Sequence, residues 1–74
     1  MPCPDQRSLA LSLQERRANE GQTRAEQARA IGVSERVLRL AEHGVEPRPA
    51  NKLPIATYLG CKVTDIWPVQ EQAA

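Results

Sequence analysis

The sequence predicts a small all-α domain of five short helices. Two observations lead to this prediction, namely the composition and the regular placement of helix start and stop signals. Ala, Arg, Glu, Gln and Leu dominate and favour helices, whereas aromatic residues, which favour strands, make up 3% of the chain. The 74 residues can form one domain at most. We expect it at residues 5–68, between a disordered N-terminus at 1–4 and a flexible tail at 69–74.

The first two helices are bounded by recognisable capping residues. Asp5 or Ser8 can serve as the N-cap of the first helix, and Gly21 suits a left-handed C-cap at its end. The second helix begins at Thr23, because Thr23 and Glu26 form the S/T-x-x-E pattern of a capping box.

A very short turn separates the second helix from the third. Gly32 ends the second helix and can supply the positive φ that a tight turn needs. Ser34 then caps the third helix, which closes near Gly44. Two helices joined in this way cross closely, so a small residue is required at the crossing, and Ala28 is the candidate.

The last third of the chain predicts a loop and two further helices. Residues 45–50 contain two prolines and are expected to form an extended loop. Asn51 caps the fourth helix, which tolerates Pro54 in its first turn and ends at Gly60. A short fifth helix is expected at residues 63–67, where the following proline terminates it.

Composition and cysteine usage argue against several classes of protein. No apolar run approaches the roughly 18 residues of a transmembrane helix, and no signal-peptide pattern is present, so we expect a cytoplasmic protein. Cys3 and Cys61 are expected to stay reduced, Cys61 as a small core residue and Cys3 as a thiol on a loose terminus. With a single histidine, His43, they form no metal site. We also expect no enzyme, cofactor or small-molecule substrate, because so small a core cannot enclose a substrate cavity.

Residues 23–44, T-R-A-E-Q-A-R-A-I-G-V-S-E-R-V-L-R-L-A-E-H-G, resemble the lambda-repressor-like (Cro/cI, or XRE-type) helix-turn-helix family. The resemblance covers residues 9–67, because Arg17 and Glu42 match an ion pair common in that family and I-A-x-x-L-G at residues 55–60 also matches. It implies a compact five-helix lambda-repressor-like DNA-binding domain with the helix-turn-helix at helices two and three.

One further feature adds to this resemblance, and two positions depart from the usual pattern of the family. The I-W-P ending at residues 66–68 resembles the small Ner-like phage regulators. Gln27 stands where the family usually has a buried leucine, so its amide needs a hydrogen-bond partner. Arg24 stands where many relatives have a glutamine that contacts phosphate, a contact that arginine can also make.

The resemblance implies that the third helix reads DNA, because the first residues of such a helix meet base edges in the major groove. The candidate base contacts are Ser34, Glu35, Arg36 and Arg39. Either arginine can bind guanine through two hydrogen bonds, and Glu35 can accept one from cytosine. The candidate phosphate contacts are Arg24, Arg48 and Lys52. The alternative is a solvated charged face with a Glu35–Arg39 ion pair. Leu40 either contacts a thymine methyl group or is simply exposed.

The function implied is a sequence-specific transcriptional regulator, in its simplest form a small phage or prophage repressor that occupies a promoter. We expect it to bind double-stranded DNA at a palindromic operator as a homodimer. The candidate dimer interface is Tyr58, Val63, Ile66 and Trp67, with the alternative that Trp67 closes the core of a monomer. Two other functions remain open: the antitoxin and autorepressor of a toxin–antitoxin pair, and a protein-binding module that uses the fold without DNA.

Overall fold

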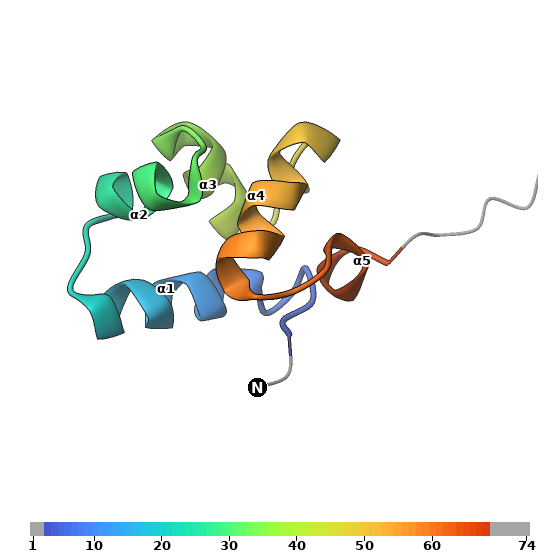
Figure 1. The fold of residues 1–74 in the computed structure, drawn as a ribbon, viewed down its shortest axis with the longest axis horizontal. Coiled ribbons are helices and arrows are strands. Elements are labelled where there is room, and N and C mark those ends of the chain that lie inside the picture. Colours follow the sequence, from blue (N-terminus) through green and yellow to red (C-terminus); the bar gives the residue numbers. More distant parts are fainter. Residues whose placement is uncertain (1–2, 69–74) are drawn as a thin grey trace, which may run out of the picture.

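The computed structural model describes residues 3–68, and within that part of the chain it contains five helices and no strand (Figure 1). They are α1 (Leu9–Glu20), α2 (Arg24–Ile31), α3 (Glu35–Glu42), α4 (Pro49–Leu59) and α5 (Val63–Ile66). The predicted all-α class is therefore confirmed. The predicted tail at 69–74 and the first two residues lie outside the described residues. None of the five helices is both long and apolar enough to cross a membrane.

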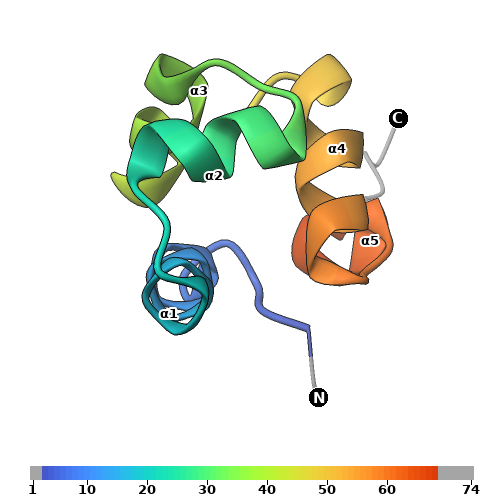
Figure 2. The same cartoon turned by 60° about the vertical axis from the view of Figure 1, so that its left-hand side comes forward.

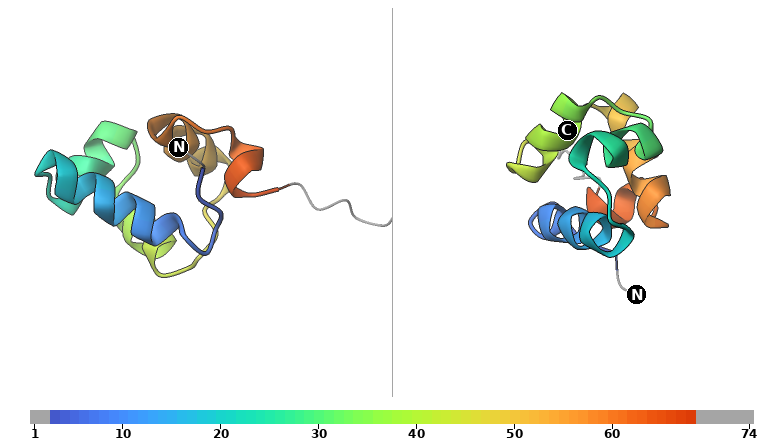
Figure 3. Two further views of the ribbon diagram at one scale, coloured as in Figure 1. Left: turned by 90° about the horizontal axis from the view of Figure 1, so that it is seen from below. Right: turned by 90° about the vertical axis from the view of Figure 1, so that its left-hand side faces the viewer.

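The helices form two groups, α1 to α3 and α4 with α5, which meet where α4 packs against α2. In Figures 1 and 2, α1 runs beneath the pair made by α2 and α3, and α4 and α5 lie to one side of that pair. α3 packs against both α1 and α2, while α4 packs against α2 and α5. Seen from below, the N-terminal segment (residues 3–8) leads from α4 and α5 back to the start of α1 (Figure 3).

Each helix contributes apolar residues to one core. Most of these residues are spaced three or four positions apart, which places them on one side of their helix. The core comprises Leu9, Leu13, Ala28, Ile31, Leu38, Ala41, Ile55, Ala56, Ile66 and Trp67. No residue outside this set except Gln27 is buried among the described residues. The side of α3 opposite the core is therefore exposed to solvent.

The start signals of α2 and α3 act as predicted. The Thr23 hydroxyl accepts a hydrogen bond from the Glu26 amide, and the Glu26 carboxylate accepts one from the Thr23 amide, which completes the capping box. Ser34 accepts a hydrogen bond from the Val37 amide at the start of α3. At α1, Ser8 occupies the N-cap position but its side chain bonds Asp5 instead of the helix.

The start of α4 differs from the prediction. The helix begins at Pro49, with Arg48 at the N-cap position, rather than after Asn51. Proline is well suited to the first helical position, because its φ is already helical and the amide hydrogen it lacks would have no partner there. The second proline of the predicted loop is therefore the beginning of the helix, and Pro54 lies inside the helix rather than in its first turn.

The structure contradicts the prediction of two reduced cysteines. Cys3 and Cys61 form a disulfide across a sequence separation of 58, with their Cα atoms 6.0 Å apart. Cys61 packs against the core as expected, but the N-terminal segment returns to it, and a sequence alone does not reveal such a return. Cys3 and Pro4, which the sequence predicts to be disordered, are consequently half-buried parts of the domain.

Candidate functional site

Helix α3 has two sharply different sides. Leu38 and Ala41 face the core and are almost completely buried. Glu35, Arg36 and Arg39 are exposed to solvent. The exposed side therefore presents two guanidinium groups and one carboxylate close to the start of the helix.

The junction between α2 and α3 is tight. The Ala28 carbonyl accepts hydrogen bonds from the amides of Gly32 at 2.8 Å and Val33 at 3.0 Å, and Gly32 has a φ of +97°. Ala28 is 2% exposed, as expected for a small residue where two helices meet. These contacts fix the direction in which α3 leaves the turn, and with it the direction of its exposed side chains.

The arginines of α3 and the following loop form no ion pair within the chain. Arg36, Arg39 and Arg48 have no carboxylate within 4.0 Å among residues 3–68. The Glu35–Arg39 ion pair, which was the alternative for this face, is absent from the same set. The charges of the three arginines are therefore directed to solvent and available to an external anion.

The other two predicted phosphate contacts already have partners. Arg24 Nε lies 3.6 Å from the Glu42 carboxylate, with the side chain 37% exposed. Lys52 Nζ lies 2.5 Å from the Glu46 carboxylate and 5.6 Å from the centre of the Trp67 ring. Either cation would have to leave or share its partner in order to contact a phosphate.

An ion pair between α1 and α3 anchors the C-terminal end of α3. Arg17 donates hydrogen bonds to both oxygens of Glu42, at 2.9 and 3.2 Å, and the Glu42 side chain is only 4% exposed. Burial raises the pKa of Glu42, but the hydrogen bond and charge of Arg17, with Gln14 and Arg24, outweigh it and hold the pKa below its usual value. The ion pair that the resemblance implied is therefore present.

Gln27 completes the same network from α2. Its side chain is fully buried, accepts a hydrogen bond from Arg17 at 2.9 Å and donates one to the Leu13 carbonyl at 2.9 Å. Both the oxygen and the nitrogen of the side-chain amide therefore have a hydrogen-bond partner, as expected. A buried leucine at this position would have offered Arg17 no acceptor.

The predicted dimer residues are largely used inside one chain. Ile66 is fully buried and Trp67 is 6% exposed, so both belong to the core, and the alternative placement of Trp67 is the one found. Val63 is half-buried against the same core. The Tyr58 hydroxyl donates to Gln22 at 3.3 Å, and its ring lies 4.9 Å from the Arg16 guanidinium carbon. Ile66 and Trp67 are therefore unavailable to a second copy, because their side chains are buried where the short helix α5 packs against the core.

A small apolar hollow, which the sequence did not predict, lies beside α3. Its volume is about 190 Å³, and it is lined by Val37, Leu40, Val45, Glu46, Pro47, Arg48 and Asn51. Leu40 and Val45 are 39% and 49% exposed. The only signal in the sequence is that Leu40 and Val45 interrupt an otherwise polar surface. Leu40 is thus exposed on the same helix as Arg36 and Arg39.

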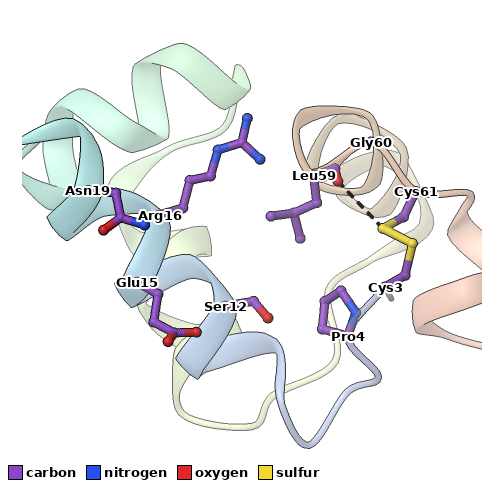
Figure 4. Close-up of a pocket in the computed structure, with 9 residues that line it drawn as sticks. All are labelled: Cys3, Pro4, Ser12, Glu15, Arg16, Asn19, Leu59, Gly60 and Cys61. Carbon is purple, nitrogen blue, oxygen red and sulfur yellow. Dashed lines mark hydrogen bonds between the residues drawn. A yellow bond between two sulfur atoms is a disulfide. The ribbon is translucent and has the colours of Figure 1, made fainter. Parts of the chain in front are cut away.

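A second hollow of about 240 Å³ separates α1 from the end of α4. Figure 4 shows Ser12 and Arg16 of α1 across from Leu59, with the disulfide at one end. Arg16 is engaged there by Glu20 at 2.9 Å and by the Tyr58 ring. Within residues 3–68, no three His, Cys, Asp or Glu side chains are grouped as metal ligands.

The chain was compared with known proteins in three ways. A scan against models of protein families, a search of curated proteins and a search of solved structures each give no match.

Proposed function

We propose that the protein is a sequence-specific DNA-binding transcriptional regulator of the lambda-repressor-like type, with α2 and α3 as its helix-turn-helix. The observation that carries the proposal is the exposed side of α3, where Arg36 and Arg39 have no ion-pair partner among the described residues. A helix that enters the major groove needs such side chains near its first turns, aimed away from the core.

The distribution of charge supports DNA over a protein partner. The formal net charge is only +1, but the carboxylates of Glu20, Glu42 and Glu46 are taken up by cations of the same chain. The cations that remain free include Arg36, Arg39 and Arg48, on α3 and at the start of α4. Unpaired guanidinium groups on and beside the exposed side of α3 are the groups that phosphates and guanine edges bind.

The position of each residue in the fold decides whether it is assigned to a base or to a phosphate. Arg36 and Arg39, with Ser34 and Glu35, are assigned to base edges, since arginine can bind guanine through two hydrogen bonds and glutamate can accept from cytosine. Arg48 is assigned to a phosphate, because it lies in the loop that follows α3. Arg24 and Lys52 are also assigned to phosphates, which they reach by leaving Glu42 and Glu46. The proposed regulator acts by occupying a promoter, and a symmetric pair of chains reads a palindromic operator.

The test is selection of bound sequences from a random pool of duplex DNA, followed by binding measurements on the preferred site. Arg36→Ala is expected to weaken that site by about 1–3 kcal/mol and to relax one position of it, whereas Arg48→Ala weakens all sequences alike. Arg7→Ala is the matched control, because Arg7 is also exposed and outside every ion pair of the described residues but precedes α1. It removes the same charge and is expected to leave affinity within about twofold.

Two outcomes would count against the proposal. Recovery of no preferred sequence would favour the protein-binding module. A loss of affinity as large for Arg7→Ala as for Arg36→Ala would mean that net charge, rather than the α3 surface, determines binding.

A further inference from the structure

The Cys3–Cys61 disulfide lies where the N-terminal segment meets the end of α4. Cys61 directly follows the end of α4, and Cys3 approaches it from the opposite end of the chain. Figure 4 shows the two sulfur atoms at the end of the hollow between α1 and α4, with Pro4 beside them. Both cysteines are half-buried, so a small thiol can reach the disulfide without unfolding the domain.

Few side-chain hydrogen bonds hold the N-terminal segment in place. Among the described residues, its side-chain hydrogen bond to the rest of the fold is the one that Gln6 Oε1 accepts from the Trp67 indole. The remaining amide group, Gln6 Nε2, is buried without a hydrogen-bond partner. An unsatisfied buried donor opposes docking of the segment. The disulfide therefore supplies a large part of what keeps the segment against Trp67.

We infer that the Cys3–Cys61 pair is a reversible thiol–disulfide site whose oxidation state determines whether the N-terminal segment covers Trp67. The substrate class is a dithiol. One thiolate of the dithiol attacks a sulfur of the disulfide, and the other cysteine leaves as a thiolate that takes up a proton. The second thiol of the reagent then displaces the remaining cysteine. Two electrons pass to the protein, which ends with two thiols, and the reagent ends as a cyclic disulfide.

The chain carries its own reporter for this change. Trp67 is the only tryptophan of the sequence, and it is 6% exposed while the segment is docked. When the disulfide is cleaved, the segment is free to leave, and the indole meets water. Cross-links that close long loops also constrain the unfolded chain strongly, so the melting temperature responds to the same reaction.

The experiment compares the oxidised protein with protein treated with dithiothreitol at 10 °C and follows Trp67 emission and far-ultraviolet circular dichroism together. Reduction is expected to move the emission maximum to longer wavelength while the helical signal is retained. The melting midpoint is expected to fall by at least about 10 °C. Cys3→Ser should reproduce the reduced state and no longer respond to dithiothreitol. Cys3 is the better site to substitute, because Cys61 also packs against the core.

Three results would overturn the inference. The first is two titratable thiols in protein that has been exposed to an oxidant. The second is an unchanged emission maximum on reduction. The third is loss of the helical signal together with the emission shift, since the disulfide would then support the whole fold rather than the position of one segment.

Discussion

Gln27 is a buried polar side chain that joins two helices. Its amide accepts from Arg17 and donates to the Leu13 carbonyl, so it holds α2 against α1 through a charged group and a backbone group. Gln27→Ala removes both contacts and leaves a cavity. We expect it to lower the free energy of unfolding by about 2–3 kcal/mol, as measured by urea denaturation.

Gln14→Ala is a suitable control for this prediction. Gln14 is exposed on α1, and its hydrogen bond to Glu42 is long at 3.4 Å. Its substitution is expected to change stability by no more than about 0.5 kcal/mol. Equal urea midpoints for Gln27→Ala and the unaltered protein would mean that the buried amide contributes nothing.

Glu42 makes the stability of the domain sensitive to acid. Its pKa is lower in the folded protein than in the unfolded chain, where the pKa of a glutamate is about 4.3. Its stabilising effect is therefore complete above that value and is lost as the pH falls through the folded pKa. We expect Glu42→Gln to be less stable at pH 7 and to show a flatter loss of melting temperature between about pH 5 and pH 3.

The control for the acid prediction is Glu15→Gln, which removes an exposed carboxylate of α1 that has no ion-pair partner among the described residues. This variant should keep the pH dependence of the unaltered protein. If Glu42→Gln also keeps it, other carboxylates cause the acid sensitivity. Candidates are Asp5 and Glu26, whose pKa values are lowered by hydrogen bonds from Ser8 and Thr23.

At the scale of helices, the crossing of α2 and α3 depends on a single small residue. Ala28 is 2% exposed between the two helices, so Ala28→Leu must force them apart. We expect a loss of about 1–3 kcal/mol or more, which is a large share of the stability of so small a domain. Thermal melting followed by circular dichroism measures it.

Ala30→Leu is the matched control, because Ala30 lies on the same helix but is exposed. Its melting temperature should stay close to that of the unaltered protein. If Ala28→Leu melts at the same temperature as Ala30→Leu, the two helices are not packed through this position.

The helix boundaries show what local sequence determines. The capping box of α2 and the serine cap of α3 act between residues three positions apart, so Thr23 and Ser34 could be assigned from the sequence alone. The side of α3 that faces solvent also follows from its apolar spacing. The start of α4 could not be placed, because Pro49 fits both an extended loop and the first position of a helix.

The pairings between distant residues could not be predicted in the same way. The Arg24–Glu42 contact and the Cys3–Cys61 disulfide depend on how the chain returns on itself, and the Lys52–Glu46 pair depends on the course of the loop that leads into α4. Arg17 with Glu42 is the exception, and it was accessible only through a family resemblance. Local signals thus determined most of the elements and the candidate face, while the partners of Arg24 and Lys52 required three-dimensional structure.

At the scale of the whole molecule, the proposed function predicts a definite response to salt. If Arg24, Arg48 and Lys52 each neutralise one phosphate, the logarithm of the binding constant should fall against the logarithm of salt concentration with a slope of about −2.7 per chain. Fluorescence anisotropy on the selected operator measures it. Arg48→Ala should reduce the slope by about 0.9. A slope near zero would exclude phosphate contacts as a source of affinity.

The proposed dimer predicts a stoichiometry of two chains per operator. One reading helix covers only a few base pairs, so two copies about one turn of DNA apart are needed for a longer palindromic site. Titration of purified operator at concentrations well above the dissociation constant measures the ratio. One chain per site, with no two-fold symmetry in the protected sequence, would contradict the dimer.

The Glu42 carboxylate lies between Arg17 and Arg24. Because Arg17 alone can neutralise it, Arg24 is able to leave it for another anion. Arg17 holds both oxygens of Glu42 at hydrogen-bond distance, whereas Arg24 only approaches it at 3.6 Å. If Arg24 turns outward to a phosphate, as the proposed function requires, the buried carboxylate keeps Arg17 as its counterion and no unpaired charge remains in the interior. The surface beside α3 then gains a positive charge without a change in composition or protonation. A chain with a net charge of only +1 can in this way present more positive charge to a polyanion than it shows when free in solution.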